Sequence, residues 1–337
     1  MSYFTGIDLH ANNNHTGIID KENQRVFNKK LRNNLAMVLE SLDPYRSEVE
    51  GIVVESTFNW YWMVDGLMDN GYKVHLANPS AIKQYEGLKH ADDVTDALHL
   101  ANLLRLGILP EGYIYPKQQR PVRDLLRKRL QLVRQRTAHI LSFQNLVRRN
   151  LGIKMSANKI KQLCEEDVEG IFEEKHLVLS GQANIGTIRF LLPRIKQIEK
   201  AVLQVAKLKD EYKNLLTVPG VGVILALTIM LETGPIERFA KVGNYASYCR
   251  CVKSQWFSNG KAKGKGNRKN GNKYLCWVYV EAANIATWNY DYVKRYYQSK
   301  MAKTNYLVAI KAVAHKLARA CYYIMRDHKE FDPKRAF

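Results

Sequence analysis

The sequence lacks the features by which disulfide-bonded, zinc-binding and membrane-spanning proteins are usually recognised. Its five cysteines are an odd number without a Cys-x-x-Cys pair, so neither a disulfide framework nor a zinc module is predicted. The apolar run at residues 223 to 231 is far too short to cross a membrane. The first ten residues show no charged segment followed by an apolar core, so we expect no export signal. These absences favour a cytoplasmic protein without membrane contact.

Acidic residues are scarce as well, since 32 Asp and Glu stand against 52 Lys and Arg, which gives a formal net charge of +20. This excess predicts a polyanionic partner, and nucleic acid is the commonest one, although ribosomal and membrane-surface proteins are also basic. The hydrophobic fraction of 46% is ordinary for a globular protein, and 337 residues suffice for two or three domains. Composition therefore indicates a class of partner but no activity.

Strand-like and helix-like patterns alternate over the first part of the chain. Strands are expected near residues 3–10, 15–19, 25–31, 49–57 and 72–79, the second and third forming a hairpin. Helices are expected near residues 34–42, 60–70 and 93–107. The alternation predicts an α/β domain over residues 1–115, with helices covering a sheet.

The middle of the chain is predicted to be a helical, coiled-coil arm over residues 116–212. Residues 120–152 form an amphipathic pattern with nine Lys and Arg and a single Asp, and a second long helix is expected at 187–216. Such an arm is either a solvated spacer or a nucleic-acid contact. In the second case Arg127 and Arg134 are candidate phosphate ligands.

The remaining residues, 213–337, are predicted to be mainly helical apart from a loop at 253–273. The Pro-Gly turn before residue 223 is similar to the hairpin of helix–hairpin–helix modules, whose backbone N–H groups bind phosphate. Gly220 and Gly222 are the candidate positions. Ordinary helix connections have the same pattern.

Four acids are candidate metal ligands. Asp8 and Glu55 lie in or at the end of predicted strands, while Asp93 and Asp96 share one face of a predicted helix. Carboxylate oxygens are preferred by Mg²⁺ and Mn²⁺, and two such ions can clamp the attacking and leaving oxygens of a phosphodiester. The competing explanation is that single acids cap helices or lie on the surface.

The loop at residues 253–275 is a second candidate site. It holds seven Lys and Arg, four Gly, four Asn and no acid, which suits contact with phosphates. Ser258 lies within it and, as a nucleophile, would need activation, for which no nearby histidine is available. The predicted nucleic-acid contacts in this loop are Lys261, Lys263, Lys265, Arg268, Lys269 and Lys273.

Five segments, in this order, carry a resemblance to a known family. They are "GIDLH", "VVEST", the block from Asn78 to Pro110, "LLTVPGVG" and "SNGKAKGKGNRKNGNKYL". Together they resemble the insertion-sequence transposases of the one-ten and eleven-eleven groups and the related Piv/MooV DNA invertases. The likeness spans the chain and is sharpest at residues 5–110 and 215–285.

The resemblance implies a RuvC-like (RNase H-like) nuclease domain with a DEDD acid set, formed here by Asp8, Glu55, Asp93 and Asp96. It implies a transposase domain whose serine becomes covalently linked to DNA, with Mg²⁺ or Mn²⁺, two per site, as cofactor. It further implies a nucleoid-associated bacterial protein that acts as a dimer or tetramer on donor and target DNA. Insertion-sequence members also use a structured guide RNA encoded by the element.

Two positions depart from the family pattern. The usual Lys-Thr-Asp reads Ala91-Asp92-Asp93, so Asp92 could compete with Asp93, although the D-x-x-D-A spacing favours Asp93. The usual Ser-Ser-Gly-Gly-Lys reads Phe257-Ser258-Asn259-Gly260-Lys261, which leaves Ser258 as the nucleophile and Ser254 as second candidate. Two alternative functions remain: a Piv-like site-specific invertase, and a RuvC-like Holliday-junction nuclease in which the serine has no role. A non-enzymatic nucleic-acid-binding protein is a third.

Overall fold

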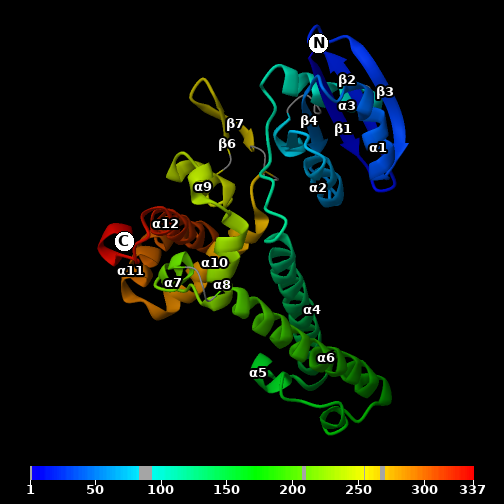
Figure 1. Ribbon diagram of the computed structural model, residues 1–337. Coiled ribbons are helices and arrows are strands. Elements are labelled where there is room, and N and C mark those ends of the chain that lie inside the picture. The colour runs from blue at the N-terminus through cyan, green and yellow to red at the C-terminus, as the bar shows by residue number, and fades with distance from the viewer. Residues whose placement is uncertain (1, 83–92, 207–209, 254, 266–269) are drawn as a thin grey trace. The chain divides into compact units, whose positions relative to one another are not determined.

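The structure is a computed structural model that describes the chain except for residues 1, 83–92, 207–209, 254 and 266–269. It divides into two compact units, the first built on Met1–Lys117 and the second on Gln118–Gly266 and Gly271–Phe337. Figure 1 draws the first unit in blue and cyan and the second in green to red. No helix of the described residues is long and apolar enough to cross a bilayer.

A five-stranded mixed sheet forms the centre of the first unit. Its strands are β1 (Tyr3–Leu9), β2 (Asn13–Asp20), β3 (Arg25–Arg32), β4 (Val49–Glu55) and β5 (Val74–Ala77). Their order across the sheet is β3-β2-β1-β4-β5. β2 runs antiparallel to β1 and β3, whereas β1, β4 and β5 are parallel to one another. The three parallel strands therefore end at the same edge of the sheet.

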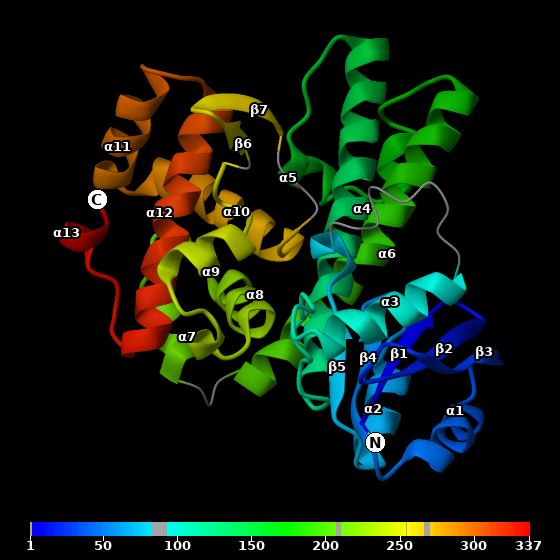
Figure 2. The ribbon, with the colours of Figure 1, turned by 90° about the horizontal axis from the view of Figure 1, so that it is seen from above.

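Helices cover both faces of this sheet. Helices α1 (Leu35–Leu42) and α2 (Tyr61–Asp69) lie on one face and α3 (Asp93–Arg105) on the other, as Figure 2 shows. α1 begins where the Asn34 side chain accepts hydrogen bonds from two backbone N–H groups of the first turn. Alternate residues of β4 pack towards opposite faces, which explains the continuous apolar run in this strand.

Two glycines allow α3 to approach the sheet closely. Gly6 in β1 and Gly17 in β2 are cross-strand partners. A Cβ atom on Gly6 would lie 1.9 Å from the carbonyl oxygen of Ala97, and one on Gly17 would lie 2.9 Å from a methyl carbon of Leu98. Because the contact at Gly6 is with the helix backbone, any larger residue there would push α3 away, whereas a larger residue at Gly17 would require the Leu98 side chain to move. The glycine pair thus fixes the distance between α3 and the strands.

The second unit begins with two long antiparallel helices, α4 (Arg120–Leu151) and α6 (Lys175–Ala206), joined through the short α5 (Ala157–Ile160). Figure 1 shows them side by side, and an ion pair of 2.6 Å joins Arg129 to Glu199. Their ends have a separate apolar core around Phe143. The second helix begins twelve residues before the predicted start at 187, because its first turns carry no strong apolar period.

A helical bundle follows, built on one large apolar core. Its helices are α7 (Asp210–Leu215), α8 (Val223–Thr233), α9 (Val242–Tyr248), α10 (Lys273–Asn289), α11 (Asp291–Met301), α12 (Tyr306–Asp327) and α13 (Pro333–Ala336). Asn272 and Asn305 cap the helices α10 and α12 with their side-chain oxygens. In the core, the hydroxyl groups of Tyr245 and Tyr279 are 2.6 Å apart.

The segment predicted as a loop at residues 253–273 contains a β-hairpin, and the loop prediction was wrong there. Strands β6 (Gln255–Ser258) and β7 (Lys261–Lys265) pair antiparallel, with Ser258 opposite Lys261. The two turn residues, Asn259 and Gly260, have φ values of 51° and 71°. An Asn-Gly pair with positive φ at both positions is the preferred two-residue turn of a hairpin. The local sequence therefore dictates this fold.

Candidate active site and nucleic-acid interface

Two of the predicted metal ligands lie beside each other at one edge of the sheet. Asp8 on β1 is buried, with 3% of its surface exposed, and Glu55 is the last residue of the adjacent parallel strand β4. Both point to the face covered by α3. Their carboxyl groups lie within hydrogen-bonding reach of each other.

The helix α3 adds the charge of Asp96 to this pair. The pKa of Glu55 is raised to about 8, first by burial and then by the hydrogen bond to Asp8 and the charges of Asp8 and Asp96. The three acids are therefore close enough to influence one another. Asp93 begins α3, but its side chain lies outside the described residues, as does Asp92. The structure thus brings three members of the predicted set together.

Three histidines surround the acids, and sequence reasoning missed them. His10 Nε2 lies 3.2 Å from Asp8 Oδ2. His15 is the cross-strand partner of Asp8 and is 8% exposed. His99, one turn after Asp96, has a pKa lowered by burial, an effect that the charge of Asp96 partly opposes. His10 follows Asp8 by two residues and His99 follows Asp96 by three, so the sequence spacing could have indicated both histidines. His15 could be placed only from the register of the strands.

The donor set suits a hard divalent cation. Carboxylate oxygens are the ligands of Mg²⁺ and Mn²⁺, and a bound cation would offset the mutual repulsion of the Asp8, Glu55 and Asp96 carboxyl groups. In the described part of the chain, no three His, Cys, Asp or Glu side chains already stand close enough to hold one metal ion.

Ser258, the predicted nucleophile, is exposed at the last position of β6, directly before the Asn-Gly turn. Lys261 and Lys263 are exposed on the neighbouring strand β7. The positions of Arg268, Lys269 and Ser254, and the side chain of Lys265, lie outside the described residues. The hairpin thus presents a hydroxyl group to solvent beside two lysines.

A basic pocket of about 640 Å³ lies between the first turns of α4 and the start of α10. Arg134 and Lys273, both predicted nucleic-acid contacts, line it together with Lys128, Gln131 and Tyr274. Arg134 and Lys273 are exposed at its rim. This pocket brings predicted contacts from distant parts of the sequence onto one surface of the second unit.

Arg127 also lines this pocket, but its guanidinium is engaged by the protein itself. Nε and Nη2 donate hydrogen bonds of 2.6 and 2.7 Å to Glu232, whose side chain is 1% exposed. Its guanidinium also lies 4.4 Å from the ring centre of Tyr274. Burial lowers the pKa of Arg127, but the hydrogen bonds and charge of Glu232 outweigh burial and raise it above its ordinary value. These contacts favour a structural role.

Gly220, the first glycine of the predicted phosphate-binding turn, is buried with a φ of 75°. A Cβ atom there would lie 2.1 Å from the carbonyl oxygen of Ala282 on α10, so packing alone requires glycine. Gly222 is exposed and precedes α8 as its N-cap residue. The exposed position of Gly222 leaves its backbone accessible to a ligand, whereas Gly220 serves the helix contact.

Comparison with known proteins identifies the family of the chain. A family model described as "Transposase", of the DEDD type of IS110, matches residues 5–150, and a second, "Transposase IS116/IS110/IS902 family", matches residues 212–298. The chain belongs to the IS110 family of transposases. The mixed sheet with many helices is compatible with an RNase H-like transposase of this family, and DEDD membership suggests dependence on a divalent metal.

Two curated relatives are similar over long stretches. The transposase for insertion sequence element IS1111A of Coxiella burnetii is 24% identical over 243 residues, which cover 67% of this chain and 62% of that protein. The transposase for insertion sequence element IS1328 of Yersinia enterocolitica is 21% identical over 333 residues, 95% of each chain. The first match thus spans less than two thirds of the relative, while the second is nearly full length.

Proposed function

We propose that this protein is a DNA recombinase that moves an insertion sequence by cleaving and rejoining DNA strands through a covalent phosphoserine intermediate. The observation that carries the proposal is the convergence of Asp8, Glu55 and Asp96 on an α/β scaffold in an IS110-family chain. Asp93 completes the set in this proposal, and the first unit acts as a RuvC-like nuclease domain. The second unit then comprises a helical arm and a transposase domain that carries the serine.

The acids would hold two Mg²⁺ or Mn²⁺ ions. Bound there, the cations would offset the charge of the phosphodiester and lower the cost of deprotonating an attacking hydroxyl group. Asp8 and Glu55 would provide oxygen ligands from rigid strands, and Asp96 from the helix that the glycine pair positions. His10, beside Asp8, would orient that carboxylate in the way that groups behind metal ligands commonly do.

Ser258 supplies the nucleophile. Its Oγ attacks a phosphodiester, so that a bond from Oγ to phosphorus forms while the bond from phosphorus to the 3′ oxygen breaks. The 3′ oxygen takes up a proton and leaves as a hydroxyl group. A 3′-hydroxyl of the other DNA then attacks the phosphoserine, restores a phosphodiester and frees the serine. The exposed position of Ser258 beside Lys261 and Lys263 supports this role.

Donor and target DNA would lie against basic surfaces of the second unit. The hairpin lysines and the pocket rim at Arg134 and Lys273 supply positive charge for phosphate contacts. The resemblance to insertion-sequence transposases supports a structured guide RNA that selects both DNAs. It also supports a dimer or tetramer in which acids and serine of different protomers form one active site.

Trapping of the covalent intermediate tests the proposal. Purified protein with Mg²⁺ and DNA containing the ends of its element should give a protein–DNA adduct that survives denaturation. Ser258→Ala should abolish the adduct and strand exchange, while Ser299→Ala, which removes an exposed serine from α11 of the same unit, should retain both. Adduct formation by Ser258→Ala at the level of the parent would refute the serine assignment, and Ser254→Ala then tests the second candidate.

Two further outcomes separate the alternatives. Cleavage by water that persists in Ser258→Ala, without rejoining, would indicate a Holliday-junction nuclease. Exchange confined to fixed inverted sites would indicate a Piv-like invertase. Sequencing of RNA that co-purifies with the protein from cells carrying its native locus tests guidance: a discrete RNA encoded beside the gene is expected, and bulk cellular RNA alone would contradict it.

A further inference from the structure

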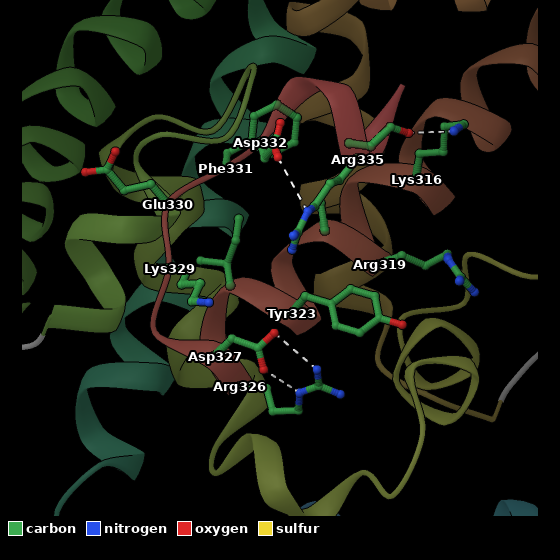
Figure 3. A pocket seen from close by; sticks show the side chains of 13 residues that line it. Lys316, Arg319, Tyr323, Arg326, Asp327, Lys329, Glu330, Phe331, Asp332 and Arg335 are labelled. Carbon is green, nitrogen blue, oxygen red and sulfur yellow. Dashed lines mark hydrogen bonds and ion pairs between the residues drawn. The ribbon is translucent and has the colours of Figure 1, made fainter.

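The second unit contains another pocket, between α12 and the chain that follows it, of about 760 Å³. One wall is a single face of α12, formed by Lys316, Arg319, Tyr323 and Asp327 at helical spacing, and the other wall is residues 329–332, 335 and 336 (Figure 3). The pocket lies beyond residue 298, where the second family match ends. Its size is within the range that accommodates a small-molecule or nucleotide-sized group.

Basic side chains dominate this pocket once its internal ion pairs are considered. Five basic and three acidic residues line it. Asp327 is paired with Arg326 at 2.6 Å, and Asp332 with Arg335 at 3.6 Å, as the dashed lines in Figure 3 show. Glu330 points to the opposite side of the view from Lys316 and Arg319. The five basic side chains outnumber the three acidic ones, and neither Lys316 nor Arg319 forms an ion pair with an acid of the pocket, so the pocket keeps a positive balance.

Arg319 is the centre of this positive charge. In the part of the chain that the structure describes, it forms no hydrogen bond or ion pair. Burial, followed by the charges of Arg319 and Lys300, lowers the pKa of Lys316. Burial and then the charge of Arg319 also lower the pKa of His315, one turn earlier on α12. Positive charges thus repel one another here, and an anion bound at Arg319 would relieve that repulsion.

We propose that this pocket binds the phosphodiester backbone of a nucleic-acid strand, with one phosphate held by Arg319 and Lys316. Arg319 provides a planar fork of N–H donors that fits phosphate oxygens, and Lys316, which donates one hydrogen bond to the carbonyl of Ala336, retains further donors. Tyr323, 38% exposed, lies beside them and offers a ring to the neighbouring sugar or base. Lys329 adds charge from the opposite wall.

A nucleic acid fits this pocket better than other polyanions because the whole chain carries a net charge of +20 and belongs to a DNA-transposing family. The inference rests on the proposed function only in one respect, which is that the protein binds nucleic acid. It does not involve the acids, the serine or a metal ion. The strand could be DNA or RNA, since both offer the same phosphodiester.

Binding measurements at several salt concentrations test the inference. The parent, Arg319→Ala, Arg319→Lys and the control Lys334→Ala are titrated against a labelled DNA duplex and a labelled single-stranded RNA. Lys334 is an exposed cation two residues from the end of the pocket wall but does not line the pocket. Loss of one phosphate contact should lower the slope of log affinity against log salt by about 0.9 for duplex DNA or about 0.7 for a single strand.

Arg319→Ala should bind at least one of the two nucleic acids about tenfold more weakly, as expected for one charge-assisted hydrogen bond. Arg319→Lys should keep the salt slope, and Lys334→Ala should bind as the parent does. An effect on duplex DNA alone, or on RNA alone, identifies the strand. Equal affinities and slopes for Arg319→Ala and Lys334→Ala with both ligands would overturn the inference. Thermal unfolding of each variant separates weak binding from misfolding.

Failure of this inference differs from failure of the proposed function. If no covalent adduct forms, the proposed function fails, but the protein can still bind DNA through Arg319. If Arg319→Ala binds nucleic acid as the parent does, this inference fails, but the proposed serine chemistry is unaffected.

Discussion

Arg127 offers a test of whether a basic residue of the arm acts on nucleic acid or on the fold. Its two hydrogen bonds to Glu232 neutralise a carboxylate that is 1% exposed. Glu232 in turn accepts a hydrogen bond of 2.7 Å from Asn272, the residue that caps α10. Arg127→Ala would therefore leave a buried charge without its cation and weaken the attachment of α4 to α8 and α10.

The expected loss of stability follows from this burial. Removing one partner of a buried ion pair costs about 3–5 kcal/mol, because the remaining charge has lost its partner but not regained water. Asn272 still solvates one carboxylate oxygen, so we expect the lower end of that range, about 3 kcal/mol. For a unit of this size, that loss lowers the melting temperature by about 6 to 12 °C.

Thermal unfolding followed by DNA binding below the transition measures both effects. Arg134→Ala is the matched control, because Arg134 is exposed on the same helix and lines the same pocket. It should unfold with the parent and bind DNA more weakly, whereas Arg127→Ala should unfold earlier and bind normally while folded. The double variant Arg127→Met with Glu232→Leu should recover much of the stability. Unchanged melting of Arg127→Ala together with weakened binding would refute the structural role.

Three further changes probe the site. The pKa of Glu55 is raised from 4.5 to about 8, so between these pH values the folded protein holds a proton that the unfolded chain has already released. The stability of the metal-free protein should therefore fall as the pH rises through that window. Glu55→Gln should flatten this dependence in melting curves, and Mg²⁺ should raise the melting temperature of the parent more at pH 8 than at pH 6.5; identical curves for parent and variant would contradict the shift. Gly6→Ala should displace α3 and cost a few kcal/mol (~2–4) together with catalytic activity, while Gly243→Ala, with open space around its Cβ, should be neutral in the same unfolding assay. Gly260→Ala, at a φ of 71°, should reduce adduct formation without lowering the main melting transition, and full adduct yield would show that the turn does not position Ser258.

The first unit follows from local patterns to a large extent. Its strands and helices lie close to the ranges expected from apolar periods and capping residues, as with the cap of α1 at Asn34. The meeting of Asp8 and Glu55 could be expected because adjacent parallel strands end at one edge of a sheet. His15 could not be assigned to this site, because its place depends on strand register, which the sequence specifies only through pairing over the whole strand.

The second unit shows why charge patterns are weaker evidence than backbone patterns. Arg127 and Arg134 cannot be distinguished from the pattern of the amphipathic helix. Arg127 nevertheless pairs with a carboxylate 105 positions away, whereas Arg134 is exposed to solvent. Gly220 likewise matches a phosphate-binding turn but is required by contact with Ala282, which belongs to a different helix. The hairpin at Asn259 could have been predicted, because Asn-Gly between strand-like runs is a strong local signal.

The hairpin also bears on how the proposed nucleophile, Ser258, is positioned. Within the described residues, β6 and β7 form a sheet of only two strands, and such a ribbon contributes little folding free energy by itself. The free energy that holds Ser258 at a fixed angle to a phosphate must therefore come from the surface against which the ribbon lies. In the proposed function, a serine held in this way would become competent only as its substrate complex assembles, which would couple substrate binding to strand cleavage.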